Sequence, residues 1–140
     1  MFNPSRDQVR DFFFQAWAKF RHAAPLTDLE KIAVEHISLH PEYHPVLEQP
    51  ERYREHEWPP EGGETNPFLH LSMHVSISEQ LAIDQPPGVK ARYARLLTRL
   101  GDAHAAQHRV MDCLAEMVWR AQRDRQPPDG AAYLDCLERP

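Results

Sequence analysis

Apolar residues recur along this chain at the spacing of helices, and prolines separate the segments that show this pattern. The first segment is predicted to run from Ser5 to about Arg21. Ser5 and Gln8 have the Ser-x-x-Gln spacing of a capping box, in which the two ends of the first turn bond each other. The apolar positions of this helix predict a buried set consisting of Val9, Phe12, Phe13, Ala16, Trp17 and Phe20.

Capping residues and prolines also bound the other predicted helices. Thr27 and Glu30 form a second capping box, and Pro41 ends that helix because it has no amide hydrogen. Asn66 is predicted to cap a third helix, with Pro67 at its first position. Helices are expected at residues 27–40, 66–84, 89–100, 102–125 and 131–137, with a short helix or turn at 42–49.

The segment at residues 50–65 is polar, rich in proline and glycine, and predicted to be the longest loop, although Arg52 to Glu57 could form a helical turn. No segment shows convincing strand alternation, and no internal repeat is evident. A chain of 140 residues suits one domain. The sequence therefore predicts a single all-α domain over residues 1–140, with a four-helix-bundle-like core and short accessory helices.

Charge and composition exclude several classes of protein. The net charge is −5, with no cluster of basic residues of the kind that binds nucleic acid, and no apolar run is long enough to span a bilayer. The N-terminal sequence does not read as a signal peptide. Cys113 and Cys136 are the only cysteines, so the simplest expectation is two reduced thiols in a cytoplasmic protein.

Histidine is the unusual residue, with nine in the chain. Three predicted helices each carry two histidines four residues apart, in "HISLH", "HLSMH" and "HAAQH". Residues four apart lie about 40° apart around a helix, and each pair falls on or beside the apolar face. The turn "HPEYH" adds one more histidine. The inward set predicted from these motifs is His36, His40, His44, His70, His74, His104 and His108.

Buried imidazoles need partners, since an unpaired buried polar group costs roughly 1–3 kcal/mol. A shared metal ion meets that need, and imidazole suits Zn, Fe and Ni. Asp112, Glu64 and Glu42 are the carboxylates expected close enough to orient ligands. His22 and His56 lie in polar surroundings and are predicted to be exposed.

Two functional hypotheses follow from this pattern. The first is a small cytoplasmic protein that binds a divalent transition metal, as a metal-dependent enzyme of unknown reaction, a sensor or a store. The second is a non-enzymatic interaction or structural protein whose histidines form a buried hydrogen-bond network. The sequence leaves a small-molecule partner and a homo-oligomer open, and it excludes neither an enzyme nor a binding protein.

The motifs "HPEYH", "GGETNPFLHLSMH", "IDQPPG" and "HAAQHRVMDCLAEMVW" resemble a family of small uncharacterised bacterial proteins, known as a domain of unknown function. The resemblance covers nearly the whole chain and implies a small soluble bacterial protein without an assigned activity. More loosely, histidines converging in a bundle resemble the DinB-like metal-dependent enzymes and the hemerythrins, which serve only as chemical analogies.

Overall fold

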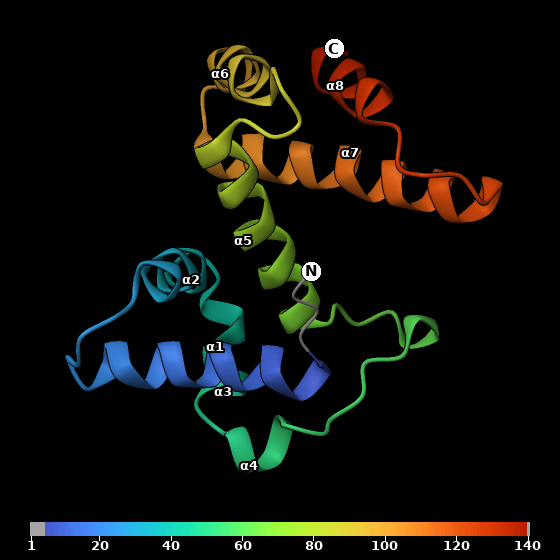
Figure 1. The fold of residues 1–140 in the computed structure, drawn as a ribbon. Helices are drawn as coiled ribbons and strands as arrows, with labels where there is room; N and C mark the ends of the chain where they lie inside the picture. Colours follow the sequence, from blue (N-terminus) through green and yellow to red (C-terminus); the bar gives the residue numbers. More distant parts are fainter. Residues whose placement is uncertain (1–4, 140) are drawn as a thin grey trace. The chain divides into compact units, whose positions relative to one another are not determined.

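The computed structural model describes residues 5–139, which form helices joined by turns and contain no strand (Figure 1). The all-α prediction is confirmed. Within this part of the chain, no helix has the length and apolar character needed to cross a membrane. The elements are α1 Arg6–Arg21, α2 Asp28–Ser38, η1 Pro41–Tyr43, α3 His44–Leu47, α4 Pro50–Tyr53, η2 Pro60–Gly62, α5 Pro67–Ile83, α6 Val89–Leu100, α7 Ala103–Asp124 and α8 Gly130–Glu138.

Contacts along the chain divide it into two compact units, Met1–Val75 and Ser76–Pro140. The boundary falls inside α5, which is one continuous helix. Each unit is described by itself below. A single domain with a four-helix core stays a prediction. The predicted loop at 50–65 contains two short helical segments, α4 and η2.

The first unit is built on α1 and α2, which pack against each other. Both predicted capping boxes are present at their N-termini, at Ser5 and Thr27. The apolar core joins α1, α2 and the first half of α5, and the rings of Phe14 and Phe68 meet edge to face at 5.3 Å. The prediction that Phe20 is buried is wrong: it is 49% exposed at the last turn of α1, where its ring stacks on Trp17.

Arg10 is a buried cation within that core, only 2% exposed. It lies three residues before Phe13 and seven before Trp17, so it shares their face of α1. Its Nη1 donates to the backbone carbonyls of residues 53, 54 and 56, at 3.2, 2.9 and 2.7 Å. Burial lowers its pKa from the ordinary value. Arg10 thereby ties the segment after α4 to α1.

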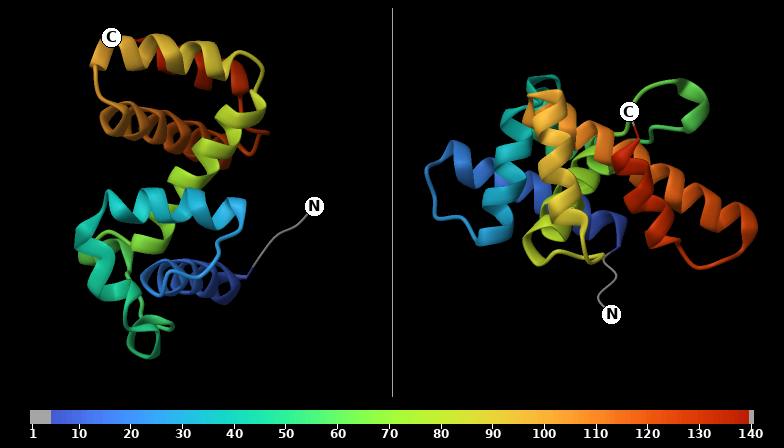
Figure 2. Two further views of the ribbon diagram at one scale, coloured as in Figure 1. Left: turned by 90° about the vertical axis from the view of Figure 1, so that its left-hand side faces the viewer. Right: turned by 90° about the horizontal axis from the view of Figure 1, so that it is seen from above.

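The second unit consists of the rest of α5 with α6, α7 and α8. Helices α6 and α8 pack against each other, and both run across the same side of α7 (Figures 1 and 2). Gly88 and Gly101 bracket α6 in left-handed conformations, at φ of 97° and 72°, which glycine adopts without a Cβ penalty. The predicted ends of α6 are confirmed, and α7 begins at Ala103, one residue after its predicted start, with Asp102 as its cap.

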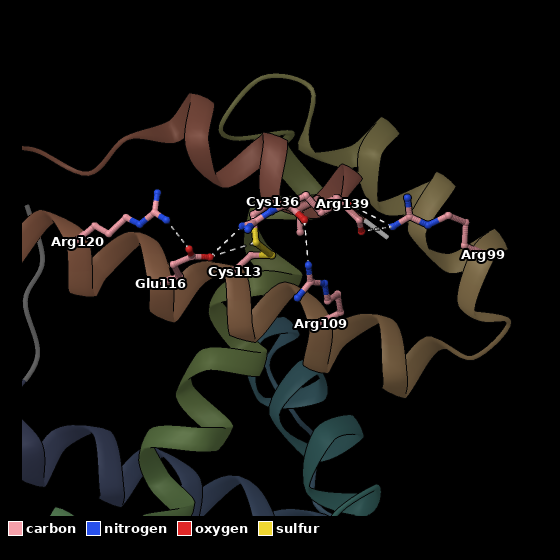
Figure 3. Close-up of a disulfide and its surroundings, with 8 residues drawn as sticks. Arg99, Arg109, Cys113, Glu116, Arg120, Cys136 and Arg139 are labelled. Carbon is pink, nitrogen blue, oxygen red and sulfur yellow. Dashed lines mark hydrogen bonds and ion pairs between the residues drawn. A yellow bond between two sulfur atoms is a disulfide. The ribbon is translucent and has the colours of Figure 1, made fainter.

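Cys113 on α7 and Cys136 on α8 form a disulfide, and both residues are almost fully buried (Figure 3). The prediction of two reduced thiols is therefore wrong. Cys113 faces the interior of its own unit, opposite the face on which the sequence predicts histidines, and α8 brings Cys136 to it. One of the grounds for placing the protein in the cytoplasm falls with this correction, and its location stays a prediction.

Arginine side chains also hold the C-terminal turn of α8 (Figure 3). Arg99 donates to the carbonyls of Leu137, Glu138 and residue 139, at 3.1 to 3.3 Å. Arg109 donates to the carbonyl of Cys136 at 3.3 Å. The last carbonyls of a helix have no partner within it, so these bonds satisfy groups that would otherwise need water.

Candidate metal centre

The N-terminal end of α5 sets the positions of two histidines. Oδ1 of Asn66 accepts the amide hydrogens of Phe68 and Leu69, at 3.0 and 3.3 Å, which is the predicted cap. His70 and His74 follow one turn apart on the same side of the helix. His74 is fully buried and His70 is half-buried. The pair therefore lies along one edge of the core of the first unit.

The third histidine comes from the turn that follows α2. That helix ends at Ser38, and His40 lies in the turn before η1, where Pro41 prevents the helix from continuing. His40 is 3% exposed. Its Nδ1–H donates to the backbone carbonyl of His36 at 2.7 Å. A carbonyl only accepts, so this bond fixes the tautomer of neutral His40 and leaves a lone pair on its Nε2.

The three side chains His40, His70 and His74 form a cluster, which we call the three-histidine cluster. Nε2 of His70 lies 3.2 Å from Nε2 of His40 and 3.2 Å from Nε2 of His74. In each of the three pairs the ring centroids lie 4.9 Å apart, and the two ring planes are steeply inclined to each other. Each residue offers one ligand nitrogen, and these nitrogens lie within 4.8 Å of one another. This arrangement could hold a metal ion.

Two aromatic rings pack against the cluster. Tyr43, from η1, stacks on His40 with centroids 5.3 Å apart and an interplanar angle of 4°. It also meets His70 edge to face at 5.9 Å. Burial raises the pKa of the Tyr43 phenol, which keeps its hydroxyl protonated at neutral pH. His36 stacks on His74 at 4.7 Å. These contacts fix the orientations of His40 and His74.

His44 has a different environment from the cluster. Its Nε2–H donates to the backbone carbonyl of Ile37 at 2.9 Å, and its ring packs on Trp17 with centroids 4.4 Å apart. The indole of Trp17 donates to Glu48 at 3.1 Å. In this arrangement His44 braces the turn between α2 and α3 against α1. Its predicted role as a ligand stays a prediction.

His104 and His108 lie on α7, in the second unit. Both are half-buried, and their rings are 4.1 Å apart, as expected for residues one turn apart. The prediction that this pair binds the same ion as the histidines of α5 stays a prediction. His22 and His56 are exposed, as the polar surroundings of both residues predict.

The three predicted carboxylates all lie in exposed positions. Asp112 is on α7, Glu42 is in η1, and Glu64 is in the segment before α5. Within residues 5–139, the group of side chains placed to hold an ion consists of histidines. The group that orients His40 is instead a backbone carbonyl, that of His36. The sequence could not predict this partner, because every residue has a backbone carbonyl and the sequence does not show where each one points.

Comparison with known proteins gives one match. The model of a family described as a domain of unknown function, DUF1841, matches residues 5–139. No curated protein and no solved structure matches the chain. The predicted resemblance to an uncharacterised family is confirmed, and it assigns no activity. Because the match spans nearly all of the sequence, the chain belongs to the DUF1841 family.

Proposed function

We propose that this protein binds a divalent transition-metal ion through Nε2 of His40, His70 and His74. The proposal rests on the three-histidine cluster in the first unit, where three ligand nitrogens lie within 4.8 Å of one another. Imidazole is a common ligand for zinc, iron and nickel, and helix pairs are a common place for such sites. The fixed tautomer of His40 supports the same reading, since metal-binding histidines generally donate their other N–H to a carbonyl or carboxylate.

The observation that carries the proposal is the sharing of one nitrogen between two short contacts. Nε2 of neutral His40 has a lone pair, so Nε2 of His70 must carry a proton to bond it. A protonated Nε2 of His70 has no lone pair to accept from His74, 3.2 Å away. A single proton on Nε2 of His70 therefore serves one of the two N···N contacts or is shared between them. A cation accepts a lone pair from all three nitrogens at once.

The spacing of the nitrogens agrees with a tetrahedral ion. Zinc binds imidazole nitrogen at about 2.0–2.1 Å, which places two tetrahedral ligand atoms about 3.3 Å apart. Nε2 of His70 lies 3.2 Å from Nε2 of both His40 and His74. Three protein ligands leave a fourth position for water, whose pKa a bound zinc lowers toward about 7. A site of this kind supports a metal-dependent enzyme; a fourth protein ligand would favour a closed structural or storage site.

Competition titration with Co²⁺ and Zn²⁺ tests this proposal on the full chain without a polyhistidine tag. We expect Co²⁺ to give a visible absorption spectrum that Zn²⁺ abolishes at one equivalent. His70→Ala should lose the spectrum, whereas the exposed control His22→Ala should keep it. Equal affinities for wild type and His70→Ala would contradict the proposal and favour a metal-free histidine network.

His108→Ala separates an open site from a closed one. If only the three-histidine cluster binds the ion, His108→Ala should keep the affinity of wild type within about threefold. If α7 supplies a ligand, as the sequence predicts, the affinity should fall by at least tenfold and the Co²⁺ spectrum should change. Either result leaves binding by His40, His70 and His74 intact; the first favours an open site with a position for water, and the second favours a closed structural or storage site.

A further inference from the structure

The first unit carries a second hollow, built from α1, α2 and α5, that contains none of the three clustered histidines. It consists of two adjoining pockets, of about 390 and about 250 Å³, which share Val9 and Ser72. We call these two pockets together the α1–α5 groove. Small-molecule sites typically have volumes of about 300–1,000 Å³, so the groove has the size of a ligand site.

The two ends of the groove differ in chemistry. The larger end is almost wholly apolar, and only Gln8 and Ser72 contribute polar side chains there. Its other lining residues are Val9, Phe12, Phe13, Leu29 and Val75. Leu29 is 40% exposed, although it is an apolar residue at the start of α2. This end therefore suits a hydrocarbon chain.

The smaller end carries two cations, Arg6 and Arg10, beside Phe68 and Leu69. Arg10 is 98% buried, since its exposure is 2%, and its bonds go to neutral carbonyls rather than to a carboxylate. Among the described residues its Nε has no hydrogen-bond partner. A buried guanidinium without a contacting anion is costly, and an anion arriving nearby lowers that cost.

Arg6 lies at the exposed side of the same end. Its Nη1 bonds Glu57 at 2.6 Å, and both side chains are about half exposed or more, at 49% and 72%. Exposed ion pairs of this kind are weak and exchange partners readily. Arg6 is therefore available to a competing anion, and Glu57 is the protein's own competitor for it.

We propose that the α1–α5 groove binds a single-chain amphiphile with a carboxylate head, such as a medium-chain fatty acid. The hydrocarbon chain lies in the apolar end, beside Phe12, Phe13 and Val75. The carboxylate lies beside Arg6, close to the buried charge of Arg10. This site is separate from the three-histidine cluster, and it stands whether or not a metal binds there.

Binding of decanoate to the full chain, followed by calorimetry and by amide NMR shifts, tests the proposal. Decanoate should bind saturably and shift the amides of Val9, Leu29 and Ser72. Octanoate, two methylenes shorter, should bind about fifteenfold more weakly, because each methylene buried contributes about fourfold in affinity. Decyltrimethylammonium, with the same chain and the opposite charge, should bind at least tenfold more weakly than decanoate.

Two variants that each remove the charge of an exposed residue test the role of the charged end. Arg6→Gln should weaken decanoate about threefold to fivefold, because it removes an exposed cation. Glu57→Gln should strengthen it by a similar factor, because it removes the competitor for Arg6. Lys31→Gln, on an exposed face of α2 outside the groove, should change nothing, and all three variants should keep the melting temperature of wild type within a few degrees.

Three results would overturn the proposal. One is non-saturable binding of decanoate, or amide shifts that fall outside the groove. Another is equal affinity for decanoate and decyltrimethylammonium, which would show an apolar surface without charge selectivity. The third is the same decanoate affinity in Arg6→Gln and Glu57→Gln. That result would show that the charged end does not recognise the carboxylate.

Discussion

The two units of this chain stabilise their helices by different means. In the first unit, three imidazoles are almost fully buried beside the apolar core, those of His36, His40 and His74 at 5%, 3% and 0% exposure. In the second, the buried link is covalent, between Cys113 and Cys136. The C-terminal turn of α8 is held in addition by arginine donors, including Arg99. One interior contains clustered imidazoles, and the other contains a bond between two sulfur atoms.

The comparison shows how polar groups in a helical interior are satisfied. In the second unit, Arg99 and Arg109 each donate a hydrogen bond to a carbonyl at the end of α8. In the first unit one nitrogen, Nε2 of His70, serves two neighbours at once. The proposed ion would bind all three nitrogens of the cluster in the first unit, and it has no role in the second unit. The two units should therefore respond separately to a chelator and to a reductant.

Loss of the ion should produce the largest effect. A ligand that binds only the native state, at about 1,000 times its dissociation constant, stabilises by about 4 kcal/mol. The reference is the urea unfolding of the wild type saturated with Zn²⁺. Relative to it, chelation or His70→Ala should lower the unfolding free energy of the first unit by about that much. His22→Ala is the control. Chelator-insensitive unfolding of the wild type would leave the cluster as a metal-free network.

Loss of the disulfide should be the next largest effect, and it should fall on the second unit. Closing a loop with a sequence separation of 23 is expected to stabilise by about 3 kcal/mol. Cys113→Ala with Cys136→Ala, or reduction of the wild type, should lower the unfolding free energy of α7 and α8 by that amount in amide exchange. The metal content of the protein should not change. A matching loss of protection in α1 and α2 would show that the units are not independent.

Replacing Arg10 tests the polar interior of the first unit away from its histidines. Arg10→Met keeps an unbranched apolar stem but removes the donor to the carbonyls of residues 53, 54 and 56. We expect a loss of about 2 kcal/mol in unfolding free energy and faster amide exchange at residues 54–58. Arg54→Met, at an exposed ion pair with Asp11, is the matched control and should cost less than about 1 kcal/mol.

The smallest predicted effect concerns Glu30 and acid. The backbone N–H of Thr27 and then Lys19 lower the pKa of Glu30 below its usual 4.5. A depressed pKa gives stability that is complete above the unfolded value and is lost as pH falls through the folded one. Glu30→Gln should therefore cost about 1 kcal/mol at pH 7 and flatten the stability curve between pH 5 and 3. A slope unchanged by the substitution would contradict this assignment.

Local signals predicted most of the helices, because caps and breakers act over a few residues. The pairs Ser5 with Gln8 and Thr27 with Glu30 mark two helix starts, and Gly101 marks an end. The spacing of His70 and His74 likewise predicted two members of the cluster that lie one turn apart. Such relations depend on helix geometry alone, and the sequence contains all of it.

Relations between distant segments were harder to predict. Nothing local shows that α8 brings Cys136 to Cys113, or that Phe20 stays exposed at the end of α1. His44 belongs to the same motif as His40, but its ring turns to Trp17 and the carbonyl of Ile37. A face of a helix predicts a direction, whereas the partner that a side chain meets depends on how the elements pack.

The metal content of the purified protein tests the central claim most directly. The full chain, produced without a polyhistidine tag, is incubated with Zn²⁺, dialysed and analysed for zinc and protein. The account predicts about one ion per chain in the wild type and in His22→Ala, and almost none in His70→Ala. A ratio near zero in the wild type after this treatment would contradict it.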